Sequence, residues 1–155
     1  IVNILALTGR FHNDIVRDSA VAKIKSHPHW EAELLELLEN DYYYHHVYTF
    51  IDGNEVKHPK LFIEPLKRSI YRMAKEIEND ITDSNNLQDW HFEHLGIERL
   101  FRAIDEQFSM EGDADFRPAI QALRKALDTE KPERFKTVRF NVTRVVDAWL
   151  NAHPS

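Results

Sequence analysis

The sequence predicts an all-α fold, and three observations support this prediction. Glycine and proline are scarce, with 4 Gly and 6 Pro in 155 residues; 30% of the residues are charged; and apolar residues recur every three or four positions along most of the chain. Few turn-forming residues suit helices joined by short links better than strands joined by many turns. Because the apolar spacing matches one face of a helix, we expect about seven helices.

Length and composition predict one helical domain that covers residues 1–155. The chain begins with Ile1 rather than Met, so we expect a module or fragment of a larger protein. Cysteine is absent, which excludes disulfides, thiolate metal sites and a Cys nucleophile. The apolar start of the chain, residues 1–7, is far shorter than the roughly 20 residues of a membrane-spanning helix. We therefore expect no membrane span and a cytoplasmic location.

The first predicted helix runs from Asp14 to Lys25. Its apolar residues fall on one helical face: Ile15, Val16, Ala20, Val21 and Ile24. A second helix follows with Pro28 in its first turn, where the missing N–H of proline is not needed. The third runs from Tyr43 to Phe50 and ends at a turn signal, residues 52–54. The alternative for residues 47–56 is a β-hairpin, but the helical spacing of the aromatic residues favours a helix.

The fourth helix opens at Pro59 and runs to Ile81 in nearly unbroken steps of three and four residues. Pro65 either kinks this helix or marks its true start. The polar residues 82–89 predict a loop, and Asp89 is placed to cap a fifth helix that carries the apolar residues from Phe92 to Phe108.

Two further helices follow a break at Gly112-Asp113. One covers Phe116 to Leu127, and the last begins at Pro132 and reaches Leu150. The residues from Val138 to Val142 alternate as they do in a strand, but the helical period continues well past a usual strand length. The sequence therefore predicts a helix here too.

Two helix starts resemble each other, which indicates a repeat. The segments that begin His27-Pro28 and His58-Pro59 match at His, Pro, Glu and Leu, and residues 115–120 are a fainter third copy. A fixed offset between copies is typical of stacked antiparallel helical hairpins. With these paired helices and a kink-forming Pro65, the chain resembles HEAT- and armadillo-type α-solenoids over residues 14–150. An irregular helical bundle is the alternative, because it produces much of the same pattern.

The resemblance to α-solenoids implies a surface that docks another macromolecule. Such families mostly bind proteins, bind nucleic acid less often, and seldom supply chemistry. It therefore implies a protein partner and a scaffold or regulatory role.

Charge is distributed unevenly along the chain. Residues 31–55 contain seven Asp and Glu and no Lys or Arg, whereas residues 117–144 contain eight Lys and Arg against three Asp and Glu. Solvated helix faces are the simplest explanation. The alternatives are that the basic end docks an acidic partner or nucleic acid, or that opposite ends of two molecules stack. The basic candidates for binding are Arg124, Arg134 and Arg139, although a net charge of −6 disfavours nucleic acid as the main partner.

The densest aromatic cluster lies at residues 42–50. Aromatic side chains with polar tips are common at protein interfaces. Three adjacent tyrosines on a helix point about 100 degrees apart, so at least one is expected to be exposed. Packing accounts for most of this cluster, and the expected binding residues within it are Tyr42, Tyr44 and His45.

One group of residues has a spacing that could hold a metal ion. His91 with His94, and His94 with Glu98, lie one helical turn apart, with Glu93 between them. The group matches neither His-Glu-x-x-His nor the paired Glu-x-x-His of di-iron bundles. Polar residues on a solvated surface explain this group more simply, so we expect no metal; a metal-dependent enzyme or regulator remains an alternative.

The sequence contains no motif for catalysis or cofactor binding. The glycine-framed serine turn of hydrolases is missing, and the glycines stand too far apart to form a phosphate-binding loop. We therefore expect no cofactor and no enzymatic activity. The predicted function is a protein-interaction scaffold, with a metal-dependent role or nucleic-acid binding through the basic C-terminal helices as alternatives.

Overall fold

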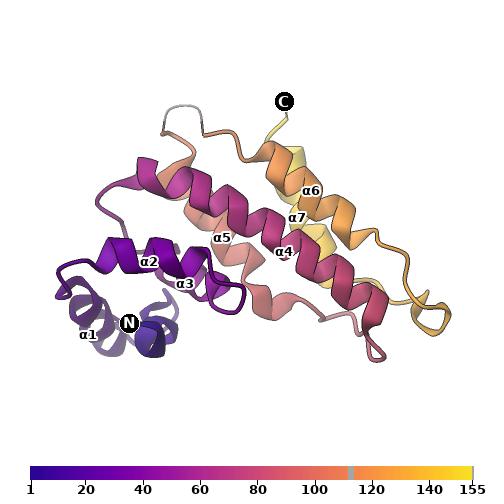
Figure 1. Cartoon of the computed structure of the whole chain (residues 1–155), viewed down its shortest axis with the longest axis horizontal. Coiled ribbons are helices and arrows are strands. Elements are labelled where there is room, and N and C mark those ends of the chain that lie inside the picture. Colours follow the sequence, from indigo (N-terminus) through magenta and orange to yellow (C-terminus); the bar gives the residue numbers. More distant parts are fainter. Residues whose placement is uncertain (112–113, 155) are drawn as a thin grey trace. The chain divides into compact units, whose positions relative to one another are not determined.

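The computed structural model describes residues 1–111 and 114–154, and throughout these residues the chain forms helices and no strands (Figure 1). The predicted all-α fold is confirmed. The chain divides into two compact units: unit 1 comprises residues 1–69 and 98–114, and unit 2 comprises residues 70–97 and 115–155. The predicted break at Gly112-Asp113 lies outside the described residues.

Unit 1 begins with a short 3-10 helix, η1 (Val2–Thr8), followed by α1 (Asp14–Lys25). The bounds of α1 are those predicted, because the side chain of Asn13 caps the helix by accepting a hydrogen bond from the Ile15 N–H at 2.9 Å. The predicted apolar face is only partly buried. Ala20 and Ile24 lie in the core, but Ile15 is 77% exposed, since the first turn of α1 does not reach the core.

The next helices of unit 1 are α2 (Trp30–Leu38) and α3 (Tyr44–Ile51), which pack on each other, while α3 and α1 both pack on η1. Residues 47–51 are helical, so the hairpin alternative is wrong there. Pro28 lies in the turn before α2 rather than in its first helical turn. The Trp30 and Phe50 rings meet at 5.7 Å, which joins α2 to α3 in the core.

A buried carboxylate ties three segments of unit 1 together. Asp52, 1% exposed, accepts hydrogen bonds from Arg102, the shortest at 2.9 Å. Nε of Arg10 lies 2.9 Å from the other oxygen, as an ion-pair contact rather than an aligned hydrogen bond. The hydrogen bond to Asp52 is the main cause that raises the pKa of Arg102. One carboxylate therefore holds two cations from distant parts of the chain.

Pro65 marks the start of a helix instead of kinking one. The 3-10 helix η2 (Pro59–Phe62) leads into α4 (Ile63–Asp83), which places Pro65 in the first turn of α4. An N–H is unused at that position, so proline is tolerated there.

The segment after α4 departs from the prediction. The helix α5 (Ile97–Ala103) begins eight residues after Asp89, is preceded by the 3-10 helix η3 (Glu93–Leu95), and continues as the π-helical turn η4 (Ile104–Phe108). The predicted helix start at Asp89 is wrong, since Phe92 and Gly96 both adopt left-handed backbone conformations that interrupt a helix.

The C-terminal half of unit 2 is a helical hairpin. α6 (Arg117–Leu127) and α7 (Asn141–Ala152) pack side by side and run in opposite directions (Figure 1). Arg117, at the start of α6, donates hydrogen bonds to the carbonyls of Leu150 and His153 at the end of α7. It therefore ties the start of α6 to the end of α7, where the Leu150 carbonyl also accepts a hydrogen bond from the His153 N–H.

The predicted start of the last helix at Pro132 is wrong. Only a short 3-10 helix, η5 (Glu133–Phe135), follows Pro132, and α7 begins at Asn141. The intervening residues leave the helical path because Phe140, 4% exposed, is buried with its ring 5.1 Å from that of Phe92. Val138 to Phe140 are thus neither helix nor strand.

No helix in the described part of the chain combines the length and the apolar composition that a membrane span requires.

Candidate functional site

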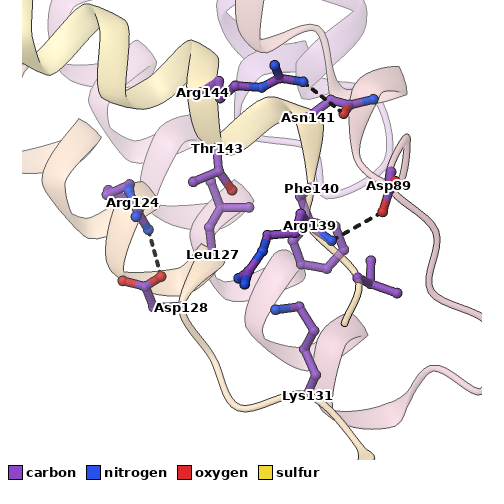
Figure 2. Close-up of a pocket in the computed structure, with 11 residues that line it drawn as sticks. Asp89, Arg124, Leu127, Asp128, Lys131, Arg139, Phe140, Asn141, Thr143 and Arg144 are labelled. Carbon is purple, nitrogen blue, oxygen red and sulfur yellow. Dashed lines mark hydrogen bonds and ion pairs between the residues drawn. The ribbon is translucent and has the colours of Figure 1, made fainter. Parts of the chain in front are cut away.

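Unit 2 contains a half-open cavity of about 470 Å³ at the junction of α6 and α7 (Figure 2). Its volume lies in the range of about 300–1,000 Å³ that is typical of ligand sites. Four basic side chains line it: Arg124, Lys131, Arg139 and Arg144. We call this cavity the cationic pocket.

Asp89 holds the backbone of residues 139–141, which line the pocket where α7 begins. Its carboxylate accepts a hydrogen bond from the Arg139 N–H at 3.2 Å, and its carbonyl accepts one from the Asn141 N–H at 2.8 Å. Phe140, between these two residues, is anchored by its ring contact with Phe92. The two hydrogen bonds to Asp89 and the ring contact between Phe140 and Phe92 therefore position the residues that begin α7.

Arg124 is held by carboxylates on both sides. Its guanidinium donates to Asp128 at 2.8 Å and to Asp147 at 2.6 Å. The hydrogen bond to Asp128 is the main cause that raises the pKa of Arg124, with a further contribution from Asp147. The charge of Arg124 is therefore balanced within the protein, and its role is to join α6 to α7.

The other three basic side chains have no carboxylate partner within residues 1–111 and 114–154. The Lys131 ammonium lies 5.2 Å above the Phe140 ring, a cation–π contact that leaves its charge unbalanced. Arg144 donates to the neutral amide oxygen of Asn141, at 3.4 Å. The Arg139 side chain extends toward the same space as Lys131, as Figure 2 shows. The pocket thus has a surplus of positive charge.

The first turn of α7 adds to the positive potential of the pocket. Asn141, Thr143 and Arg144 line it, and the residue before the helix, Phe140, offers no capping side chain. The N-terminal N–H groups of a helix carry a partial positive charge that favours anions. The Thr143 hydroxyl supplies one more hydrogen-bond donor. This arrangement suits the binding of an anionic group.

The structure brings two of the three basic candidates together. Arg124 and Arg139 line the cationic pocket, whereas Arg134 lies outside its lining, 3.4 Å from the Asn85 carbonyl and 5.0 Å from the ring centre of Phe135. In the sequence, Lys131 and Arg144 stand out only as members of the basic run at residues 117–144. What distinguishes them is that no carboxylate in the described part of the chain pairs with them, which only tertiary contacts reveal.

The three aromatic candidates do not share an exposed face. Tyr42 is 80% exposed, but Tyr44 is fully buried, with its ring 6.0 Å from that of Tyr48. His45 is half-buried and stacks on His46 at 4.5 Å. Tyr44 therefore belongs to the core, and of the three candidates only Tyr42 is largely exposed.

The four metal candidates contact other partners. His91 pairs with Asp80 at 2.6 Å, and Glu93 accepts a hydrogen bond from the Asn141 amide at 3.0 Å. Glu98 lies 4.0 Å from Arg102, one turn further along α5, and His94 is exposed. In the described part of the chain, no three His, Cys, Asp or Glu residues gather in a group that could hold a metal ion.

The described residues form an all-helical fold with a cavity, lined by four basic side chains, at the junction of two antiparallel helices. Comparison of the chain with protein-family models, with curated proteins and with solved structures finds no match.

Proposed function

We propose that the chain is a non-catalytic protein-interaction domain that binds an acidic segment of a partner protein in the cationic pocket. The observation that carries this proposal is the convergence of Lys131, Arg139 and Arg144 on one cavity, where none of the three has a carboxylate partner among the described residues. In a protein with a net charge of −6, unbalanced cations in one place favour a local anionic ligand.

The arrangement of charge favours an acidic segment over nucleic acid. A nucleic-acid surface neutralises several phosphates along a track of basic residues. Here the neighbouring basic residues are used within the protein: Lys136 pairs with Glu130 at 3.0 Å, and Arg124 pairs with two carboxylates. Lys131, Arg139 and Arg144 concentrate positive charge in the pocket, and Arg134 lies outside its lining.

A finer proposal for the architecture is that the helices form a short α-solenoid. Its support is that consecutive helices pack as pairs, α2 with α3 and α6 with α7, and that both matching His-Pro segments lie near a helix start: His27-Pro28 in the turn before α2, and His58-Pro59 at the start of η2. A compact domain of this length has a radius of gyration of about 15 Å. Small-angle X-ray scattering should give a larger value for an elongated array, and a value near that of a compact domain would contradict the solenoid.

Fluorescence anisotropy with a labelled peptide of eight glutamates tests the proposed function. At low salt the protein should bind the peptide, and the variant Lys131→Gln/Arg139→Gln/Arg144→Gln should bind at least about tenfold more weakly, a loss of about 1.4 kcal/mol. The matched control is Lys23→Gln/Lys60→Gln/Arg99→Gln, which removes the same charge from exposed positions outside the pocket. This control should keep near wild-type affinity.

Two results would overturn the proposed function. Equal weakening in both triple variants would show that binding depends on net charge rather than on the pocket. Tighter binding of a labelled single-stranded oligonucleotide than of the peptide, lost in the pocket variant, would favour nucleic-acid binding instead.

A further inference from the structure

The cationic pocket provides more positive charge and more donors than one carboxylate can use. Lys131 comes from the loop after α6, Arg139 from the segment before α7, and Arg144 with Thr143 from the first turn of α7. A carboxylate presents two oxygens and one negative charge. A phosphate monoester presents three terminal oxygens and a charge of about −1.5 to −2 at pH 7, which matches three cations and a hydroxyl approaching from different elements.

The two acidic residues of the pocket do not prevent an anion from binding. Asp89 accepts a hydrogen bond from the Arg139 N–H, and Asp128 accepts one from Arg124. Both carboxylates are therefore turned toward donors of the protein. Four basic against two acidic side chains leave an excess of positive charge in the lining, and a doubly charged ligand offsets more of that excess than a singly charged one.

The pocket also has an apolar wall and room for more than a phosphate ion. Leu127 and Phe140 are buried residues that line it together with the half-buried Val138. A volume of about 470 Å³ accommodates the stem of a side chain as well as its charged end. An apolar wall next to a cationic centre suits a phosphorylated side chain better than inorganic phosphate alone.

From these observations we infer that the cationic pocket recognises a phosphorylated residue of the partner segment, so that phosphorylation of the partner controls binding. This inference rests on the proposed function and specifies the anionic group. The Arg139 and Arg144 guanidinium groups can each make two parallel hydrogen bonds to phosphate oxygens, while the Lys131 ammonium acts as a point charge.

The test compares three labelled peptides with the same flanking residues. Their centre is a serine, a phosphoserine, or two consecutive glutamates. The glutamate pair matches the charge of phosphoserine but not its tetrahedral arrangement of oxygens. We expect phosphoserine to bind at least about tenfold more tightly than the glutamate pair, because only phosphate engages all the donors. The pocket variant Lys131→Gln/Arg139→Gln/Arg144→Gln should lose this preference, and circular dichroism checks that the variant remains helical.

Arg139→Lys is a milder variant that tests the same point without a change in charge. It should reduce the preference for phosphoserine, because an ammonium cannot replace a guanidinium that makes two hydrogen bonds. Inorganic phosphate should compete with the phosphopeptide for the cationic pocket of the wild-type protein. Binding of the phosphopeptide should also weaken between pH 7.5 and pH 5.5, as the phosphate takes up a proton with a pKa of about 6.

The outcomes separate this inference from the proposed function. If the glutamate pair binds as tightly as phosphoserine and binding needs the pocket, the inference fails while the proposed function stands. If no peptide binds, both fail. If phosphoserine binds more tightly but equally well to the pocket variant, the phosphate is recognised elsewhere, which also overturns the inference.

Discussion

Asp89 and Arg139 are joined by a hydrogen bond of 3.2 Å from the Arg139 N–H to the Asp89 carboxylate, and this bond links the loop after α4 to the segment that begins α7. The neutral amide oxygen of an asparagine can accept the same bond. Mutation of Asp89 can therefore remove its negative charge while keeping the hydrogen bond that positions Arg139. This separates the two effects of Asp89 on the cationic pocket.

Asp89→Asn should strengthen the binding of an acidic peptide by about two- to fivefold, a gain of less than about 1 kcal/mol for a partly exposed charge. The amide oxygen of asparagine still accepts the hydrogen bond, while the repulsion between Asp89 and the ligand is removed. Fluorescence anisotropy measures this change. Asp89→Ala, which also removes the acceptor, should lower the unfolding temperature as well. Weaker binding by Asp89→Asn, with the fold intact, would contradict this role.

Tyr44→Ala should destabilise the protein by about 3–5 kcal/mol, the usual cost of deleting a large aromatic side chain from a core. Tyr42→Ala should change the free energy of unfolding by less than about 0.5 kcal/mol, since exposed substitutions rarely do more. Urea denaturation of both variants gives the comparison. Similar losses in the two variants would mean that Tyr42 packs against part of the protein.

Asp52, Arg10 and Arg102 should show strongly non-additive mutational effects. Arg10→Gln or Arg102→Gln alone leaves the buried carboxylate one cation, so we expect a loss of about 1 kcal/mol for either variant. The double variant leaves Asp52 buried and unpaired, and the expected loss is about 3–5 kcal/mol. Chemical denaturation of the four proteins in this cycle measures the coupling. A double loss equal to the sum of the single losses would show that Asp52 does not need a cation.

The pair Glu31 and His58 should make stability depend on pH in the acid range. Burial raises the pKa of Glu31, but hydrogen bonds from the His58 ring and from the N–H groups of His58 and Lys57 outweigh it, so the pKa lies below its ordinary value. A lowered pKa in the folded state means that stability is present above the pKa of the unfolded chain, about 4.3. This stability is lost as the pH falls through the folded value.

Urea denaturation at pH 7 and at pH 3 tests this dependence. Glu31→Gln should reduce the difference in stability between the two pH values. Glu36→Gln, an exposed change on the same helix, is the control and should leave the difference as in the wild type. If both variants show the wild-type difference, another group controls the acid sensitivity.

The sequence was sufficient to predict the fold class and the helices with regular apolar spacing. The bounds of α1 agree with the prediction because a local signal, the Asn13 cap, defines its start. The starts of α5 and α7 were wrong because they depend on tertiary contacts: Phe92 adopts a left-handed conformation and Phe140 packs against it. The helix propensity of the neighbouring residues predicts neither the conformation of Phe92 nor its contact with Phe140.

The candidate site was only partly predictable for a related reason. The basic run near the C-terminus pointed to Arg124 and Arg139, which do line one cavity. Whether a cation is balanced depends on carboxylates that approach from other elements, such as Asp147 beside Arg124. Alternation and spacing likewise did not reveal that Tyr44 is buried while Tyr42 is exposed.

The contact between Arg117 and the end of α7 has a practical consequence for protein engineering. The guanidinium at the start of α6 binds the carbonyls of Leu150 and His153, so removing residues 150–153 would leave a half-buried guanidinium without these acceptors. An affinity tag or a fluorescent fusion should therefore be joined after His153, with the preceding residues kept intact. A tag that replaces them would disturb the hairpin that forms the cationic pocket and would appear, misleadingly, as a loss of ligand binding.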